Sequence, residues 1–185
     1  MDLSTAEPRT GARVFAIGHS TVAQGELLDR LQDLGVRTLA DIRSYPRSRH
    51  NPQFNRDVLA EAAGARGLRY VHLRDLGGRR RPKPGDETNA GWHSASFRGY
   101  ADYMQTEAFA RALDGLIARA ADGPVAILCS EAVPWRCHRS LVADALLVRG
   151  VEVLQVVGKT VRPHRLTPFA RVRGTQVTYP AGAAA

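Results

Sequence analysis

One short pattern occurs three times along the chain: a glycine ends a helical segment and an apolar strand follows at once. It is seen in LGVRTLADI, RGLRYVHL and RGVEVLQVV, where the glycines are Gly35, Gly67 and Gly150. Glycine accepts the left-handed backbone that closes many helices, and an apolar run without alternation is typical of a strand buried on both faces. The pattern predicts successive βαβ units and therefore a parallel sheet covered by helices on both sides.

Five strands are expected from this pattern and from two further apolar runs. We predict them at residues 14–17, 36–42, 68–73, 124–129 and 151–157. Helices are predicted between them, with Asn55 and Thr106 as N-caps and an amphipathic helix at 139–149. The predicted fold class is α/β, a three-layer α/β/α arrangement around a mostly parallel five-stranded sheet.

The length and composition favour one domain. A chain of 185 residues with 44% apolar composition can bury one sizeable core. We expect a flexible leader at 1–12, a single α/β domain at 13–161, and a tail at 162–185 that packs on the domain without extending the sheet. The chain start lacks the apolar stretch of a secretory signal, so a cytoplasmic protein with no membrane partner is expected. Cys129 and Cys137 are then interpreted as free thiols.

The charge suggests an anionic partner. The formal net charge is +8 and the pI is about 10.3, and a positive field speeds encounter with phosphates. Of the 26 basic residues, only Lys83 and Lys159 are lysine. Such a bias toward arginine arises as easily from codon composition as from ligand binding, so the positions of the arginines matter more than their number.

Polar residues gather behind the predicted strand ends. In an open parallel sheet, the loops leaving the carboxyl ends of the strands line one edge, where backbone N–H groups and helix N-termini favour ligands. The opposite edge receives only short turns such as DLGV and ARGL. The candidate ligand-binding residues at the carboxyl edge are His19, Ser20 and Thr21 after the first strand, Arg43, Ser48 and Arg49 after the second, and Cys129, Arg136 and Arg139 after the fourth.

Several of these segments resemble a known family. IGHST, DIRSYPRSRHNPQFN, LRYVHLRDLGG and CSEAVPWRCHRSLVADAL are similar to a bacterial and archaeal family catalogued as domain of unknown function 488 (DUF488). The resemblance runs from about Val14 to Val157 and implies an α/β fold, but no established reaction. It also implies a site formed by His19, Ser20, Asp41, Arg43, Ser48, Arg49, Asn55, Cys129, Glu131, Cys137, His138 and Arg139.

The segment from Cys129 to Arg139 offers thiol chemistry. Cys137 stands at the predicted start of a helix between Arg136 and Arg139, where the helix dipole and both cations favour the thiolate. Cys137 is therefore the better candidate nucleophile, while Cys129 is interpreted as a small buried hydrophobe. The loop loosely resembles the phosphate cradle of cysteine phosphatases and rhodanese-like sulfurtransferases. However, it is one residue longer, and Pro134 and Trp135 remove or obstruct N–H donors.

A metal site formed by Cys129, Cys137, His138 and His19 is the next alternative. C-x7-C-H is not a structural zinc spacing, and an adjacent Cys–His pair seldom binds one ion. The sequence therefore predicts no metal and no cofactor. His19 is expected to bond within its loop, and His138 to cap the helix or orient Glu131.

Two carboxylates could serve acid–base chemistry. Glu131 and Asp41 are predicted at neighbouring strand ends among arginines that can hold a phosphate. The alternative is an internal network of Asp–Arg and Glu–Arg pairs that only holds the loops. The leading hypothesis is a small enzyme acting on a phosphorylated ligand, a nucleotide or nucleic acid component, with Glu131, Asp41, Cys137 and His138 as candidate catalytic residues.

Two other functions stay open. The loop 77–95 contains the basic run from Arg79 to Lys83, and with Trp92 and His93 it suits either a solvated loop or a lid that stacks on a base. A non-catalytic nucleic-acid-binding module could use this loop. Thiol chemistry through Cys137 or Cys129 is the third hypothesis.

Overall fold

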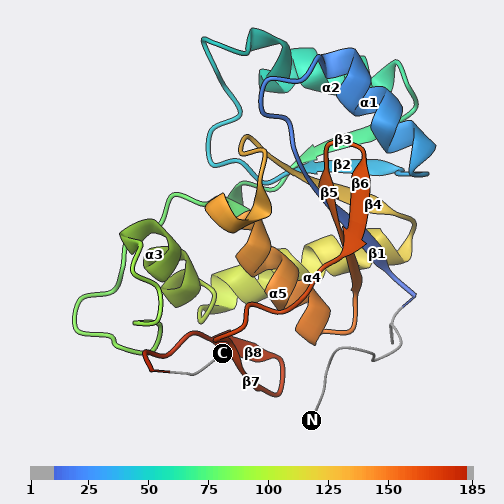
Figure 1. Ribbon diagram of the computed structural model, residues 1–185. Helices are drawn as coiled ribbons and strands as arrows, with labels where there is room; N and C mark the ends of the chain where they lie inside the picture. The colour runs from blue at the N-terminus through green and yellow to red at the C-terminus, as the bar shows by residue number, and fades with distance from the viewer. Residues whose placement is uncertain (1–10, 183–185) are drawn as a thin grey trace.

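A computed structural model describes residues 11–182 and contains a six-stranded sheet in the order β3-β2-β4-β1-β5-β6 (Figure 1). The leader predicted at 1–12 and the alanine end of the tail lie largely outside the described residues. The first five strands are parallel to their neighbours, and the sixth is antiparallel to β5. The strands are β1 (Arg13–Gly18), β2 (Thr38–Asp41), β3 (Arg69–His72), β4 (Val125–Cys129), β5 (Glu152–Val157) and β6 (Thr160–Pro163).

The α/β prediction is confirmed, with one strand more than expected. The tail was predicted not to extend the sheet, but β6 adds Arg162 and Pro163 to its edge. The cause is local: Gly158 and Lys159 form a two-residue turn between β5 and β6, and Gly158 has a positive φ of 56°. Glycine accepts the positive φ that such tight hairpin turns require, so the chain folds back antiparallel. The predicted boundary at residue 161 therefore falls inside a strand.

Helices cover both faces of the sheet, as Figure 1 shows. The two on one face pack on a core that includes Leu28, Leu39 and Leu59, and the three on the other face pack on a second core that includes Ile127 and Leu141. The helices are α1 (Gln24–Asp33), α2 (Arg56–Gly64), α3 (Ala95–Tyr103), α4 (Glu107–Ala121) and α5 (Arg139–Val148). Short 3-10 turns are η2 (Pro52–Phe54), η3 (Arg74–Leu76) and η4 (Pro134–Arg136).

The glycine pattern acts as predicted. Gly35, Gly67 and Gly150 have φ values of 68°, 73° and 79°, in the left-handed region that closes a helix. Thr106 caps α4 by accepting a hydrogen bond from the Phe109 N–H at 3.2 Å. Asn55 does stand at the N-cap of α2, but its side chain bonds elsewhere. Helix ends were thus predicted better than the bonds that stabilise them.

Helix α5 differs from its prediction. It was expected to be amphipathic, but residues 139–146 are buried on every side. The sheet and α4 cover part of it, and the hairpin of β7 (Arg171–Arg173) and β8 (Gln176–Thr178) covers the rest. The fully buried Asp144 carboxylate ties this tail to α5, accepting bonds from Thr167 Oγ1 at 2.6 Å and Tyr179 Oη at 2.7 Å. Because the tail covers the face of α5 that the sheet leaves open, both faces of this helix are buried.

No helix within residues 11–182 combines the length and apolar character needed to cross a bilayer.

Candidate functional site

The loops after β1, β2 and β4 meet at the carboxyl edge of the sheet because these strands are neighbours. Gly18 pairs with Cys129, and Asp41 pairs with Leu128. A cavity of about 420 Å³ lies at this edge. A Cβ on Gly18 would lie 1.7 Å from the Glu131 carbonyl oxygen, so only glycine lets the β4 loop cross β1 at this point. The cavity is lined by His19, Ser20, Arg43, Ser44, Tyr45, Arg47, Ser48, Asn51, Gly78, Arg79, Ser96, Phe97, Cys129, Ser130, Glu131, Arg136, Cys137 and His138.

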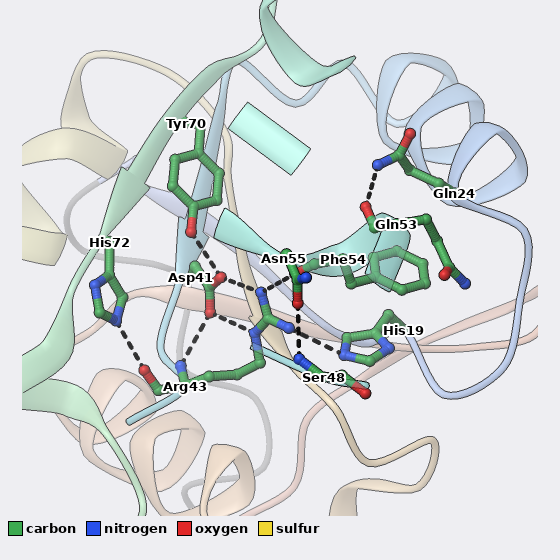
Figure 2. A network of polar contacts seen from close by, with 10 residues as sticks. All are labelled: His19, Gln24, Asp41, Arg43, Ser48, Gln53, Phe54, Asn55, Tyr70 and His72. Carbon is green, nitrogen blue, oxygen red and sulfur yellow. Dashed lines mark hydrogen bonds and ion pairs between the residues drawn. The ribbon is translucent and has the colours of Figure 1, made fainter. Parts of the chain in front are cut away.

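The Asp41 carboxylate is fully buried and accepts four hydrogen bonds from within the protein (Figure 2). It binds the Arg43 guanidinium through two bonds, Nε to Oδ1 at 2.8 Å and Nη2 to Oδ2 at 2.5 Å. Its Oδ1 also accepts the Arg43 backbone N–H at 3.1 Å, and its Oδ2 accepts the Tyr70 hydroxyl at 2.8 Å. Burial and the neighbouring Asp41 raise the pKa of Tyr70, which keeps this hydroxyl protonated as a donor. Asp41 is therefore not a free base, contrary to its predicted catalytic role.

Arg43 is shared between this network and the cavity. Its Nη2 donates to the Phe54 carbonyl at 2.8 Å, and its Nη1 lies 3.3 Å from His19 Nε2. The side chain is almost fully buried but reaches the cavity wall. Its pKa is raised by the hydrogen bonds and charge of Asp41, against the effect of burial. Arg43 is thus a fixed positive charge, and its main ionic partner is the buried Asp41 carboxylate.

His19 is held as a neutral ring. Its Nδ1 lies 2.9 Å from the Ser20 carbonyl oxygen, which can only accept, so Nδ1 carries the proton and Nε2 accepts from Arg43. The ring stacks on Phe54 with centroids 4.1 Å apart. Burial lowers the pKa of His19, and the Arg43 charge lowers it further. The predicted hydrogen bond within the loop is present.

The loop after β2 is tied by polar side chains. Asn55 Oδ1 accepts the Ser48 backbone N–H at 2.7 Å, and Ser48 Oγ accepts the Asn51 N–H at 3.0 Å. Figure 2 shows Ser48 and Asn55 joined in this way beside Arg43. Ser48 lines the cavity, whereas Asn55 supports the loop from behind. Asn55 was predicted to bind ligand, but its amide instead positions the loop that carries the cavity residue Ser48.

Arg139 is a scaffold residue. Its side chain is fully buried, and it donates from Nη1 to the Glu131 carbonyl at 2.9 Å and from Nη2 to the Ala132 carbonyl at 3.3 Å. Both bonds hold the β4 loop against the start of α5. Arg139 does not line the cavity, so its predicted role in anion binding is not supported by its position.

Cys129, Cys137 and His138 line the cavity as a cluster of donor atoms. His138 Nδ1 lies 3.9 Å from Cys129 Sγ and 3.7 Å from Cys137 Sγ, and the three donor atoms lie within 4.8 Å of one another. His138 Nε2 lies 3.1 Å from the Ile42 carbonyl oxygen. His138 was predicted to cap α5 or to orient Glu131, but its side chain makes no capping bond and faces the two sulfurs instead.

The two neighbouring thiols differ in acidity, and the negative charge is favoured on only one of them. A hydrogen bond from Cys137 lowers the pKa of Cys129 against the effect of burial, and the Glu131 N–H lowers it further. The same bond between the two cysteines, together with burial, raises the pKa of Cys137. Cys137 was expected to be the more acidic thiol, so this ranking is reversed. The cause is that α5 begins at Arg139, after the loop has already buried Cys137 beside its neighbour.

The cavity rim is charged and aromatic. Arg47, Arg79 and Arg136 are exposed and line it together with the exposed carboxylate of Glu131. Within residues 11–182, no hydrogen bond or ion pair from a side chain engages that carboxylate. Tyr45, which is 60% exposed, lies under the Arg79 guanidinium at 5.0 Å. The rim thus combines three available cations, one available carboxylate and an exposed ring.

A sequence profile of the domain of unknown function DUF488 matches residues 24–146. The match covers more than half of the chain. The chain belongs to the DUF488 family. No curated protein and no solved structure gives a significant match to it. The family assignment agrees with the resemblance seen in the sequence motifs and carries no reaction with it.

The family match spans most of the cavity-forming loops of this DUF488 protein. Its limits leave out the β1 loop with His19 and Ser20, although these two residues line the cavity. Thr21 and Arg49 are exposed outside the cavity, so the structure does not bring them to the other candidates. The predicted residues that it does bring together are His19, Ser20, Arg43, Ser48, Cys129, Glu131, Arg136, Cys137 and His138.

Nine cavity residues of the DUF488 protein lie outside the predicted candidate set. Six of them stand in the loops that directly follow the predicted strands: Ser44, Tyr45, Arg47, Gly78, Arg79 and Ser130. The other three were missed altogether. Asn51 lies in the β2 loop, while Ser96 and Phe97 come from the start of α3. The polar character of Asn51 and its position between Ser48 and Asn55 are a signal that could have found it. Ser96 and Phe97 have no such signal, because α3 does not follow a strand end and reaches the cavity only through tertiary packing.

The basic loop does not form an aromatic lid over the cavity of the DUF488 protein. Trp92 packs into the core against Phe97 and Phe169, with ring centroids 4.7 and 4.9 Å apart. Arg80 stacks over the Tyr103 ring at 3.5 Å. The fully buried Asn89 ties the loop to the tail through the Tyr179 N–H. Trp92 is therefore a structural residue, and the lid hypothesis for it is wrong.

Proposed function

We propose that this protein is a small enzyme that binds a phosphate-bearing ligand, a nucleotide or nucleic acid component, in the cavity at the carboxyl edge of the sheet. The observation that carries the proposal is the meeting of Arg43, Arg47, Arg79 and Arg136 with the carboxylate of Glu131 in one cavity. Arginines hold phosphate oxygens through charge-assisted bonds, and a carboxylate beside that anion can move a proton.

The arginines differ in what they can offer an anion. Arg43 has a fixed position because Asp41 and Phe54 hold it, so little rotamer entropy is lost when it contacts a ligand. Arg136 and Arg47 are exposed and free to adapt. The Ser44 and Ser48 side chains add hydroxyl groups to the same wall. A rigid cation surrounded by adaptable ones suits a phosphate group that enters from solvent.

Exposed aromatic rings favour a ligand that carries a base. Tyr45 is 60% exposed at the rim and Trp135 is 68% exposed next to Arg136. Large rings are normally covered, and an uncovered ring beside cations is suited to stack on a nucleobase. This supports a nucleotide or nucleic acid component over inorganic phosphate alone.

Glu131 is the proposed acid–base group. It follows β4 directly and lines the cavity with its carboxylate exposed. Asp41, the other candidate, is occupied by Arg43 and Tyr70 and is left out of the proposed chemistry. In this role, Glu131 would accept a proton from water or from a sugar hydroxyl of the ligand.

A cavity of about 420 Å³ with buried reactive groups favours an enzyme over a flat binding module. The basic run near Arg79 is consistent with either function. We further propose that the protein acts in the cytoplasm, because Cys129 and Cys137 are both free and thiols persist in reducing compartments.

Binding of inorganic phosphate and of 5′-mononucleotides, measured by calorimetry, tests the anion site. Arg136→Ala should weaken mononucleotide binding about tenfold, the effect of losing one charge-assisted bond. The matched control is Arg69→Ala, which removes an exposed arginine at the amino end of β3 and should leave the affinity unchanged. Equal affinity in the wild type and in an Arg79→Ala, Arg136→Ala double variant would refute the anion site.

A second measurement tests catalysis separately. Glu131→Gln keeps the size of the side chain and removes its charge, so it should preserve mononucleotide binding and abolish turnover of a phosphorylated substrate found by screening. A variant that keeps full turnover excludes Glu131 as the acid–base group. Oligonucleotide binding with a steep salt dependence and no preference for the cavity would favour the non-catalytic module instead.

A further inference from the structure

We propose that Cys129, Cys137 and His138 bind a divalent transition-metal ion, with Zn²⁺ the best fit, in the wall of the cavity. Two thiolates and one imidazole are ligands that zinc prefers, and a Cys₂His set occurs in catalytic zinc sites. The three donor atoms already lie within 4.8 Å of one another. The proposal does not rest on anion binding, because it concerns the metal alone.

The spacing of the donors fits a tetrahedral ion. With zinc–sulfur and zinc–nitrogen bonds of about 2.3 and 2.0 Å, tetrahedral geometry places each sulfur about 3.5 Å from the nitrogen. The corresponding distances from His138 Nδ1 are 3.7 Å to Cys137 Sγ and 3.9 Å to Cys129 Sγ. Small side-chain movements would therefore complete the three bonds.

The His138 ring is oriented as a ligand. The Ile42 carbonyl oxygen, 3.1 Å from Nε2, can only accept, so Nε2 carries the proton and the Nδ1 lone pair faces the two sulfurs. Metal-binding histidines typically donate their other ring N–H to a carbonyl or carboxylate in this way. A Cβ on Gly78 would lie 2.3 Å from His138 Nδ1, so this glycine leaves the space that the ring occupies.

The backbone explains how two adjacent residues can reach one ion. Neighbouring side chains point in opposite directions in a regular strand, so an adjacent Cys–His pair in that conformation cannot direct both side chains at one ion. Here Cys137 is extended, with φ −135° and ψ 138°, while His138 is helical, with φ −52° and ψ −18°. The chain turns between them, and both side chains face Cys129 at the end of β4.

The protein supplies three ligands, and the fourth position faces the cavity. Cys129, Cys137 and His138 all line the cavity wall, so a water or a ligand atom can complete the coordination. An open position distinguishes catalytic zinc sites from structural ones, which have four protein ligands. The ion would thus add a Lewis acid to the arginine-lined cavity. Under this proposal both cysteines are metal ligands rather than nucleophiles.

The decisive experiment uses full-length, untagged protein, reduced and stripped of metal with a chelator. Titration with Co²⁺ should produce thiolate-to-cobalt charge-transfer absorption and the visible bands of a tetrahedral ion, saturating at one ion per chain. Titration with Zn²⁺ against a chromophoric chelator gives the affinity. Wild-type protein that binds no Co²⁺ under these conditions, or that binds it without charge-transfer bands, overturns the proposal.

Variants assign the ligands. Cys137→Ser should lower the Zn²⁺ affinity at least about hundredfold, and Gly78→Ala, which displaces the ring without removing a ligand, about tenfold. The control His50→Ala removes an exposed histidine outside the cavity and should leave the affinity unchanged. Zn²⁺ binding that survives in Cys137→Ser overturns the assignment. Loss of metal binding with intact mononucleotide binding, or the reverse, separates this proposal from the proposed function.

Discussion

Two polar clusters lie at the same edge of the sheet, and they differ in whether their groups are already paired. In the first, each oxygen of the Asp41 carboxylate already accepts two hydrogen bonds, from Arg43 and Tyr70, so it has no acceptor position left for a ligand. In the second, Cys129, Cys137 and His138 direct their donor atoms at one another across 3.7 to 3.9 Å around the imidazole nitrogen. The first cluster is complete, because its charges and hydrogen bonds are paired within the protein. The second is incomplete, because its three donor atoms have the composition and spacing of a metal site that lacks its ion.

The comparison separates scaffold from site in a way that residue type alone does not. A buried ion pair with every hydrogen bond made holds loops in place, and breaking it leaves an unpaired charge. A cluster of thiol and imidazole donors that face each other is stabilised when a metal ion binds between them. Asp144, which anchors the tail through Thr167 and Tyr179, belongs with the first kind even though it does not line the cavity.

The largest expected effect comes from breaking the complete cluster. Asp41→Ala leaves the buried Arg43 without its counter-ion and should lower the free energy of unfolding by about 3 to 5 kcal/mol, measured by urea denaturation. The control Asp29→Ala removes a carboxylate that is 65% exposed and paired with Arg66, and should cost less than about 1 kcal/mol. Equal losses in the two variants would mean that the Asp41 network does not hold the edge together.

The next effect is a gain at the incomplete cluster. Zn²⁺ at about one hundred times its dissociation constant should stabilise the wild type by about 2.7 kcal/mol, because it binds the folded chain and not the unfolded one. Cys137→Ser should remove this gain while remaining folded without metal. The measurement is urea denaturation with and without Zn²⁺. If the metal stabilises both proteins equally, the ion binds elsewhere and the contrast between the clusters fails.

A smaller loss is expected when one bond of the complete cluster is removed. Tyr70→Phe deletes the hydroxyl that donates to Asp41 at 2.8 Å and should lower stability by about 2 kcal/mol, the value of a bond to a charged group. Asp41 keeps its two bonds from the Arg43 guanidinium and the one from the Arg43 backbone N–H, so the fold should persist. Chemical denaturation checks the size, and Zn²⁺ affinity should be unchanged in this variant. A Tyr70→Phe variant with altered metal affinity would show that the clusters are not independent.

The smallest effect concerns the rim. Arg136→Ala removes an exposed side chain and should change the unfolding free energy by no more than about 0.5 kcal/mol. Arg139, three residues later, is fully buried and holds the loop through two carbonyls, so Arg139→Ala should cost several times more. Thermal unfolding of the pair is the measurement. Similar stability in both variants would contradict the distinction between a scaffold arginine and a rim arginine.

Much of the fold was predictable because it rests on local signals. A glycine C-cap followed by a buried strand requires only neighbouring residues, and Gly35, Gly67 and Gly150 adopt the expected left-handed backbone. The edge at which polar residues collect was also predictable, since parallel strands align their carboxyl ends. The antiparallel β6 was missed because the Gly158–Lys159 pair was not interpreted as a hairpin turn, and because Arg162 and Pro163 were assigned to the tail.

The roles of the candidate residues were less predictable, because they depend on partners distant in sequence. The hydrogen bonds to the Asp41 carboxylate include one from Tyr70, which lies on another strand. Asn55 supports Ser48 rather than capping α2 with its side chain. Cys137 was predicted to be the reactive thiol because it was placed at the start of a helix, but the folded loop buries it beside Cys129. Burial and pairing decide such roles, and neither is a property of the residue itself.

The sequence by itself determined the βαβ order, the parallel sheet and the edge that bears chemistry, because periodicity and glycine positions act over a few residues. Only the tertiary structure decided which polar groups are spent on holding the loops and which remain open to a ligand. The physical reason is that hydrogen-bond saturation is settled between segments, here between the ends of β2, β3 and β4 and the start of α5, that are separated by tens of residues in the chain.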